Sequence, residues 1–436
     1  MTAGEESVET LEPPSPPVRR SLWRHRDFML VWLGQSASMF GSTVSFIALP
    51  LIGVLLLELS AFEMGLVATA STVPGVLLSP FSGTIVDRVD RRRLMIGADL
   101  GRALLIVSIP LATLFGVLSM AQLIVVGGGL AVLTRLFNLA HMTFLPSVVE
   151  EESLADGNSK LEASQSVADV SGPGAAGLLV TAVGPAVTVL VDAGSYVVSA
   201  VSLARVRFSS AASAAVKPRG RSLKGFWRDT VTGFRLMWTD EVLRSISVSY
   251  ASLALFAQIQ MVVYMLFLVR NLHFPPIVIG LVFALSGVVG FGAALLGGRL
   301  AGTLGVGRLL VLGQGAMVAG GVLLASVAGS TVQAAGTMLV AEAFFAIGMS
   351  FWGVGSRTLF QIRTADEVRG RVIGASGVLT GVLVACSGLL GGALGSAFGL
   401  RTALVIGAVG MLLSLALVLR RRVWMVHLDK TKVGQA

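Results

Sequence analysis

Long apolar runs recur along the whole chain, and short polar turns separate them. Each run holds about 20 residues, which is enough for one α-helix to cross the hydrocarbon core of a bilayer. The turns consist of glycine, proline, serine and charged residues, as at Glu58–Phe62 and Gly184-Pro185. Backbone groups cannot stay unpaired in hydrocarbon, so the runs are predicted to be helices.

The pattern predicts an all-α membrane protein with twelve transmembrane helices. The spans are expected near residues 28–57, 62–86, 94–118, 122–142, 163–183, 186–204, 243–269, 277–301, 309–328, 333–354, 372–396 and 401–420.

Composition agrees with a protein whose solvent is largely lipid. The chain of 436 residues is 54% hydrophobic and 13% charged, with a mean hydropathy of +0.83. A soluble domain carries about a quarter charged residues. The single cysteine, Cys386, lies within an apolar run and excludes both a disulfide framework and a multi-cysteine metal site.

The net charge of +9 comes from arginines that collect on one side of the predicted membrane. The turns on the other side hold only Arg270 and Arg401. By the positive-inside rule, this distribution places both termini in the cytoplasm of a multi-pass plasma-membrane protein. Anionic lipid of the inner leaflet then accounts for the basic charge, and no nucleic-acid partner is needed. The inside segments hold Arg19, Arg20, Arg24, Arg26, Arg88, Arg91–Arg93, the basic residues of 205–244 and 357–371, and Arg420–Arg422.

A polar segment in the middle of the chain divides the spans into six and six. Within it, Ser222–Trp238 mixes aromatic and basic residues and predicts an amphipathic helix in the membrane interface. Gly172–Gly177 and Ser387–Gly392 echo each other, which predicts the pseudo-symmetric halves of a rocking transporter. The expected organisation is a disordered cytoplasmic tail over 1–27, an N-terminal half over 28–204, a cytoplasmic linker over 205–242, a C-terminal half over 243–420 and a cytoplasmic tail over 421–436.

The turn between the second and third predicted spans carries a charged motif. Asp90 stands where the pattern G-x-x-x-D-R-x-G-R-R has a glycine. The other defined positions are matched by Gly83, Asp87, Arg88, Arg91 and Arg92.

Through this motif and its position, the chain resembles the major facilitator superfamily over nearly all of its length. The resemblance implies that Asp87 helps to latch the two halves together on the cytoplasmic side. The alternative is that Arg91–Arg93 only anchor the topology. A second family element, G-x-x-x-G-P-x-x-G-G of exporters, is matched in part, at Gly172, Pro173 and Gly177. Small residues at a helix crossing would explain that match without a further function.

Charged residues inside the spans are costly and are therefore functional candidates. Glu342 is the first candidate for a proton-coupling carboxylate, and Asp192 and Asp99 are further ones. Asp99 lies three residues before Arg102 on the same helix face, so these two side chains are expected to pair, and a structural role is the alternative for all three acids.

Polar and adaptable side chains predict a substrate cavity between the halves. Arg135 is a candidate for an anionic substrate group, unless it reaches to the inner leaflet instead. Methionine and aromatic residues can line an adaptable apolar pocket, although packing is the alternative for each. The further cavity candidates are Gln35, Gln258, Met261 and Met265, with Tyr264, Phe267 and Phe283 beside them.

The motifs of other classes are missing from the sequence. It has no phosphate-binding Gly-Lys-Ser/Thr loop, no His-Glu-x-x-His pattern and no Gly-x-Ser-x-Gly elbow, so we expect no enzyme, cofactor or metal. The resemblance to multidrug, macrolide and enterobactin exporters implies proton-coupled efflux of amphiphilic small molecules by a monomer. An uptake symporter and a non-transporting sensor or scramblase are the alternatives.

Overall fold

The computed structural model describes residues 21–207, 223–419 and 421–424. Most of the two predicted tails, residues 1–20 and 425–436, and part of the predicted linker, residues 208–222, lie outside these residues. Within the helices, the description does not extend to the side chains of Pro80, Ser82, Gly83, Thr84, Val86, Asp87, Arg88, Glu151, Leu223, Lys224, Phe226, Asp366, Arg421 and Arg422.

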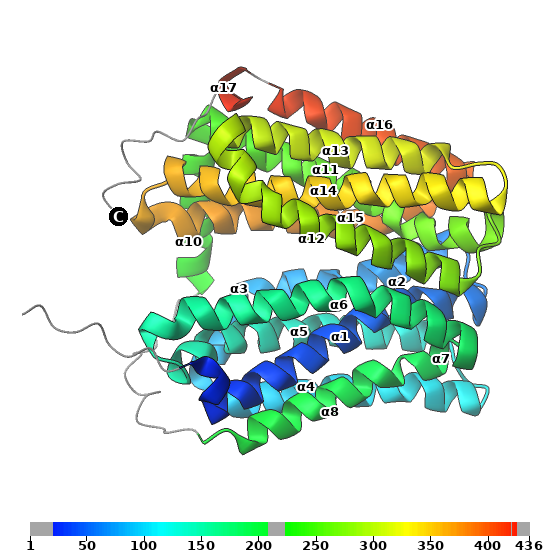
Figure 1. Ribbon diagram of the computed structural model, residues 1–436, viewed down its shortest axis with the longest axis horizontal. Helices are drawn as coiled ribbons and strands as arrows, with labels where there is room; N and C mark the ends of the chain where they lie inside the picture. Colours follow the sequence, from blue (N-terminus) through cyan, green and yellow to red (C-terminus); the bar gives the residue numbers. More distant parts are fainter. Residues whose placement is uncertain (1–20, 208–222, 420, 425–436) are drawn as a thin grey trace, which may run out of the picture.

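The described residues form helices and no strands, and twelve helical segments are long and apolar enough to cross a membrane. The predicted fold class is confirmed. Figure 1 shows the spans running side by side, with the two halves one above the other. The N-terminal half contains η1 (Leu22–Arg24), α1 (Arg26–Leu55), α2 (Ala61–Ala70), α3 (Val73–Arg88), α4 (Arg91–Leu114), α5 (Met120–Phe144), η2 (Leu145–Ser147), η3 (Glu151–Ser153), α6 (Leu154–Val183), α7 (Pro185–Thr188) and α8 (Leu190–Arg205).

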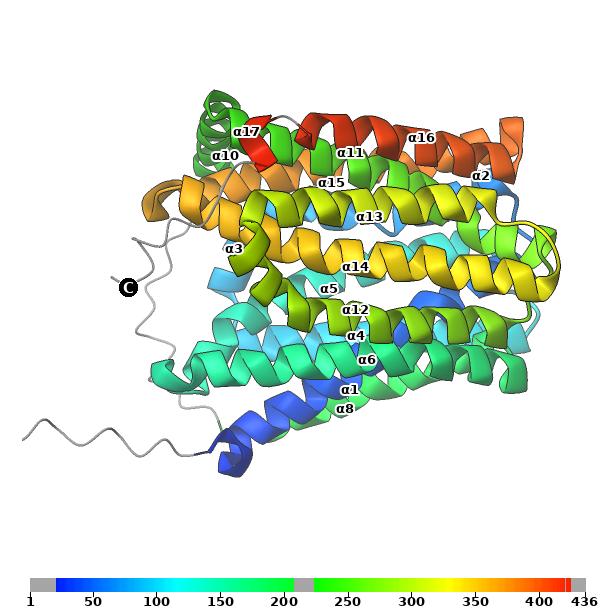
Figure 2. The same ribbon diagram turned by 45° about the horizontal axis from the view of Figure 1, so that its top comes forward.

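The C-terminal half repeats the arrangement of six spans, preceded by α10 at one end of the bundle (Figures 1 and 2). This half contains α10 (Leu223–Thr239), α11 (Glu241–Leu266), η4 (Phe267–Asn271), α12 (Pro276–Leu304), α13 (Val306–Ser326), α14 (Thr331–Arg363), α15 (Asp366–Phe398), α16 (Leu400–Val418) and α17 (Arg421–Trp424).

Capping side chains set where several helices begin. Ser60 and Glu63 form a capping box on α2, and Ser330 and Gln333 form another on α14. Such caps satisfy the backbone N–H groups that the first helical turn leaves without partners. Asp90, the residue that departs from the charged motif, caps α4 by accepting a hydrogen bond from Arg93 N at 2.8 Å. The departure therefore has a structural role in starting the third span.

The helices differ from the predicted spans mainly at their ends. α14 continues to Arg363 and α15 starts at Asp366, so most of the predicted charged loop between them is helical. α6 likewise starts at Leu154 and not near residue 163. Hydropathy marks only the part of a helix that lies in lipid, and these helices extend beyond it.

The second predicted span, 62–86, is interrupted. α2 ends at Ala70 and α3 starts at Val73, with Pro74 in the first turn of α3. Proline lacks an N–H donor and its ring clashes with the carbonyl group four residues earlier, which explains a break at this place. The hydroxyl of Thr72 donates to Ala68 O at 3.0 Å and supports the end of α2.

The two halves contact each other closely at one end of the bundle. We call this the closed end; it is formed by the turns at residues 56–60, 115–119, 184, 272–275, 327–330 and 399. There α6 packs on α12 and α2 packs on α15. Arg270 donates to Leu59 O at 2.9 Å, and Phe62 N donates to Ser396 Oγ at 2.9 Å, both between the halves. The opposite end, which carries α10, is called the α10 end.

Glycines allow the backbones to meet at the closed end. A Cβ atom at Gly177 of α6 would lie 2.8 Å from Pro276 O and 3.0 Å from Gly280 Cα of α12. A Cβ atom at Gly65 of α2 would lie 2.9 Å from Gly392 Cα of α15. Small residues give helices this close approach in a membrane, where lipid contributes little driving force for helix association.

Candidate functional site

Three adjoining cavities lie between the helices, and Phe46 of α1 lines all of them. The Arg102 cavity has a volume of about 550 Å³ and the Glu342 cavity about 480 Å³. The methionine cavity, lined by Met64, Met261 and Met265, has about 280 Å³. Each of the first two is named after a charged residue in its wall. Together they form a central space reached by both halves.

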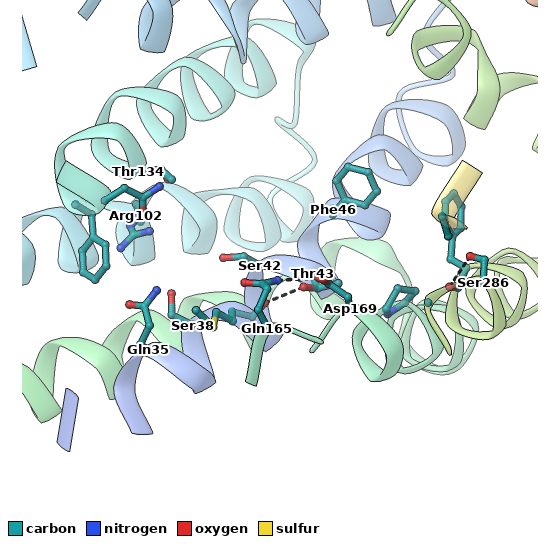
Figure 3. Close-up of a pocket in the computed structure, with 17 residues that line it drawn as sticks. Gln35, Ser38, Ser42, Thr43, Phe46, Arg102, Thr134, Gln165, Asp169 and Ser286 are labelled. Atoms are coloured by element: carbon teal, nitrogen blue, oxygen red, sulfur yellow. Dashed lines mark hydrogen bonds between the residues drawn. The ribbon is translucent and has the colours of Figure 1, made fainter. Parts of the chain in front are cut away.

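The Arg102 cavity has a polar wall, shown in Figure 3. Gln35, Ser38, Ser42 and Phe46 all line it from α1. Their spacing of three or four residues places them on one face of the helix. Because α1 begins at the α10 end, Gln35 and Ser38 bring this wall towards that end.

Other helices complete the same wall. Gln165 Nε2 of α6 donates to Asp169 Oδ1 at 2.7 Å, and both residues line the cavity. Across from them, α12 contributes Phe283 and Ser286. The contact between α6 and α12 extends to Asp169, because a Cβ atom at Gly287 of α12 would lie 2.9 Å from Asp169 O.

Arg102 belongs to a buried charged cluster of the N-terminal half. It forms an ion pair with Asp99 one turn earlier on α4, as the spacing predicted. Its guanidinium group lies over the rings of Phe137 and Tyr196, 4.4 and 4.3 Å from their centroids. Aromatic faces attract cations, so the two rings stabilise the charge inside the bundle. Asp192 of α8 accepts a hydrogen bond from Ser42 Oγ at 3.3 Å.

The Glu342 cavity contains the carboxylate of the C-terminal half. Tyr264 Oη of α11 donates to Glu342 Oε1 of α14 at 2.7 Å. Tyr264 is buried, whereas Glu342 is half-buried in the cavity wall. A rigid donor thus holds the carboxylate at a surface that a bound molecule can reach.

The other predicted cavity residues divide into two groups. Gln258 and Met261 line both the methionine cavity and the Glu342 cavity, and Met265 lines the methionine cavity. Arg135 is exposed on α5 and is not among the residues that line these three cavities. Phe267 is buried and likewise absent from their walls.

The charged motif is described only in part. Arg91 Nη1 donates to Thr143 O at 3.3 Å, and Arg92 donates to Leu203 O at 2.8 Å and to Ala204 O. These bonds join the start of α4 to the carboxyl ends of α5 and α8, where a cation is favoured by the helix dipole. The side chains of the other matched positions, Gly83, Asp87 and Arg88, lie outside the described side chains.

The partial exporter motif in α6 lies between two neighbours. A Cβ atom at Gly172 would lie 2.7 Å from Thr43 Cβ of α1, and Gly177 faces α12. Between them, Pro173 lines the Arg102 cavity. The motif therefore packs α6 against both halves next to the cavity.

Sequence reasoning did not identify Phe46 or Gln165 as cavity residues. Phe46 follows Ser42 by four positions, so the polar stripe of α1 could have identified it. Gln165 lies near the start of the predicted span 163–183, and no pattern separated it from the other polar residues there. Among the described residues, no three His, Cys, Asp or Glu side chains cluster as a metal site would require.

Known proteins resemble this chain in sequence. The multidrug efflux pump Tap of Mycobacterium tuberculosis (strain ATCC 25618 / H37Rv) is 27% identical over 346 residues, which cover 77% of this chain and 78% of that protein. Tap of Mycolicibacterium fortuitum is 30% identical over 217 residues, which cover 48% of this chain and about half, 51%, of that protein.

Solved structures resemble it in fold. A bacterial homologue of the iron transporter ferroportin in its inward-facing state has a TM-score of 0.74 at 18% identity, over 92% of this chain and 98% of that one. The nucleoside transporter NupG has a TM-score of 0.69 at 11% identity, over 90% and 97%. At such identities the likeness shows the fold alone.

The family follows from the sequence match and the architecture together. The model of the Major Facilitator Superfamily matches residues 31–388, and the helices of both halves surround a central cavity. The chain is a transporter and not an enzyme, and it is a multi-pass protein of the cell membrane. It belongs to the Major Facilitator Superfamily.

Proposed function

We propose that this transporter exports drug-like or secondary-metabolite small molecules in exchange for protons, by alternating access. The observation that carries the proposal is Glu342, a carboxylate held by Tyr264 in the wall of the central cavity. Ionisable groups inside a membrane are costly and are typical of proton pathways. A carboxylate in contact with the substrate space can exchange a proton when that space opens to either side.

The lining of the cavities supports amphiphilic substrates. The Arg102 cavity offers amide and hydroxyl groups, whereas the methionine cavity offers Met64, Met261 and Met265. Methionine side chains are flexible and polarizable and adapt to different apolar shapes. A molecule with one polar and one apolar region fits this combination. The efflux pump Tap, similar over 77% of this chain, supports export as the direction.

We place the α10 end on the cytoplasmic side. The arginine distribution supports this orientation through the positive-inside rule. α10 itself exposes Trp227 and Trp238, at 55% and 50%, beside the exposed Arg228 and Arg235. Tryptophan and arginine on one helix face favour the headgroup region of a membrane. Asp87 then lies on the cytoplasmic side, where we propose that it acts as the latch of the outward-facing state.

The proposed cycle uses the two ends of the bundle in turn. With the closed end sealed by the contacts of α6 with α12 and α2 with α15, substrate enters the cavity from the α10 end. Rocking of the halves then opens the closed end to the outside, where substrate leaves and Glu342 takes up a proton. The proton is released after the return to the inward-facing state.

The proposal is tested in everted membrane vesicles with ethidium as an amphiphilic probe. A proton gradient, acid inside, should drive ethidium into vesicles that carry the wild type, and the uptake should consume part of the gradient. Glu342→Gln should abolish this gradient-driven uptake. Glu162→Gln, which changes an exposed acid of α6 outside the three cavities, should leave it intact.

Two outcomes would contradict the proposal. Gradient-driven uptake that persists in Glu342→Gln would show that Glu342 does not couple transport to protons. Ethidium movement in the opposite direction, with cells made more sensitive to the probe by expression, would indicate an uptake symporter.

A further inference from the structure

The N-terminal half contains a buried cluster with more acidic than basic groups. Asp99, Arg102 and Asp192 are 0%, 3% and 1% exposed. Two carboxylates thus share one guanidinium group in the interior of the half. If both acids were ionised, the cluster would carry a net charge of −1, and an unbalanced buried charge is strongly unfavourable. One proton on either carboxylate removes the imbalance.

Among the described residues, Arg102 is the cation that acts on the two carboxylates. α8 adds Tyr196 and α1 adds Ser42, whose hydroxyl groups lie 3.0 Å apart. From α5, His141 stacks on Phe137 with ring centroids 6.1 Å apart, and Arg102 contacts the ring of the same Phe137. The charged residue that α6 contributes to the cavity wall is Asp169, which is also acidic. Among the described residues, the cluster therefore has one guanidinium group for its two carboxylates.

Atoms of the cluster also lack partners. Asp99 Oδ1 receives the bond from Arg102, whereas Oδ2 is buried and makes no hydrogen bond with the described residues, although Ser199 lies close enough to interact with this carboxylate. Arg102 Nε is buried without an acceptor in the same part of the structure. Buried polar atoms are nearly always satisfied, so each exception requires an explanation. A proton on Asp99 Oδ2 would remove the charge of this carboxylate, and the hydroxyl oxygen of Ser199 is the neighbour that would accept the new O–H bond.

The cluster is connected to the substrate space. Arg102 and Ser42 both line the Arg102 cavity, and this cavity shares Phe46 and Phe283 with the Glu342 cavity. A molecule that occupies the central space therefore contacts the walls of both acidic sites. Binding at one place can thus change the protonation of a carboxylate in each half.

We propose that the Asp99–Arg102–Asp192 cluster is a second proton site. Each half then carries one proton site, and two protons are exchanged for each substrate molecule. The inference rests on the proposed proton-coupled function and adds a site and a stoichiometry to it. At each site, a proton from water on one side of the membrane forms one carboxyl O–H bond, and that bond breaks when the proton is released to water on the other side. No oxidant, reductant or other co-reactant is needed.

The test counts the protons released when the purified full-length transporter binds ethidium. The measurement uses a pH indicator in weakly buffered detergent solution at saturating ethidium, and fluorescence anisotropy confirms binding. The wild type should release two protons per ethidium bound. Asp192→Asn leaves the neutral Asp99–Arg102 pair and should release one, as should Glu342→Gln, and the double variant should release none.

Two further variants make the test independent of one substitution. Asp99→Asn leaves Asp192 as the only acid beside Arg102 and should also release one proton. Asp156→Asn, which removes an exposed acid paired with Lys160 on α6, should still release two.

Each contrary result has a distinct meaning. If the wild type releases one proton, Glu342→Gln releases none and Asp192→Asn still releases one, the second site is wrong while the proposed function stands. If binding persists in Asp192→Asn but both protons are lost, the two sites are not separate and the inference is also wrong. If the wild type binds ethidium without releasing protons, the proposed function itself fails.

Discussion

Tyr264 and Glu342 show how one hydrogen bond positions a carboxylate in the cavity wall. The tyrosine donates at 2.7 Å from a position 78 residues away in the chain. The sequence identifies Glu342 because a carboxylate interrupts an apolar run, but no pattern indicates which side chain on another helix will meet it. Arg102 and Arg135 illustrate the same limit. Both interrupt apolar runs, yet only the packing of α4 and α5 decides that Arg102 lines the cavity.

Tyr264→Phe should weaken transport because it removes the donor of Glu342 and retains the ring. A hydrogen bond to a charged group contributes about 1.5–3 kcal/mol, so we expect gradient-driven ethidium uptake to fall about tenfold or more. Tyr250→Phe makes the same chemical change in the same cavity without touching that bond and should have little effect. Equal rates in the two variants would show that Glu342 does not depend on the tyrosine.

α10 shows what determines the position of a helix outside the spans. Its mixed aromatic and basic sequence predicts a helix over Ser222–Trp238, and a helix forms at Leu223–Thr239. The sequence does not reveal its partner, which is α15. Gly233 packs against Arg371 O, Met237 is buried, and Asp229 forms an ion pair with Arg371 at 3.1 Å. These contacts, and not amphipathicity alone, hold α10 at the end of the bundle.

Reversing one charge of that ion pair should loosen α10. Arg371→Glu places two carboxylates together, and because Arg371 is 40% exposed the expected loss is only about 0.2–1 kcal/mol. Hydrogen–deuterium exchange of Leu223–Thr239 should become faster, and Asp229→Arg in the same chain should restore protection. Arg235→Glu, an exposed position of α10, is the control. No recovery in the double variant would exclude the ion pair as the cause.

At the scale of the whole molecule, the sequence predicts two groups of six spans but not which end of the bundle is sealed. The proposed cycle requires the same helices to pack in at least two arrangements, and the pattern of apolar residues along the chain is compatible with both. What identifies the closed end is the approach of particular backbones, such as Gly177 to Gly280 and Gly65 to Gly392. The glycines are visible in the sequence, but many other glycines of the spans face open space, as at Gly292.

Gly177→Ala should shift the transporter away from the arrangement with a sealed closed end. Its Cβ atom would lie 2.8 Å from Pro276 O, and overpacking of this kind costs about 1–3 kcal/mol. Such a change alters a two-state population about tenfold or more. Spin labels at Val183 and Val332, both exposed at this end in different halves, should report longer distances by electron resonance in a Cys386→Ser background.

Gly174→Ala is the matched control for this measurement. Its Cβ atom would lie 3.4 Å from Ala284 Cβ, which is ordinary contact, so the distance distribution should stay that of the parent protein. A shift of equal size in both variants would mean that general loosening of α6, and not the glycine contact, changes the population.

The glycine contacts also determine how the closed end responds to pH and salt. The contacts of α6 with α12 and of α2 with α15 bring carbonyl oxygens and Cα atoms together, and neither group changes its charge with acidity or salt. With this end proposed to face the outside, these two backbone contacts should hold equally well when the pH or the salt concentration of the surrounding medium changes. Opening of this end is then controlled by binding and protonation in the central cavity. Inhibitors applied from outside would meet few side chains at these two contacts.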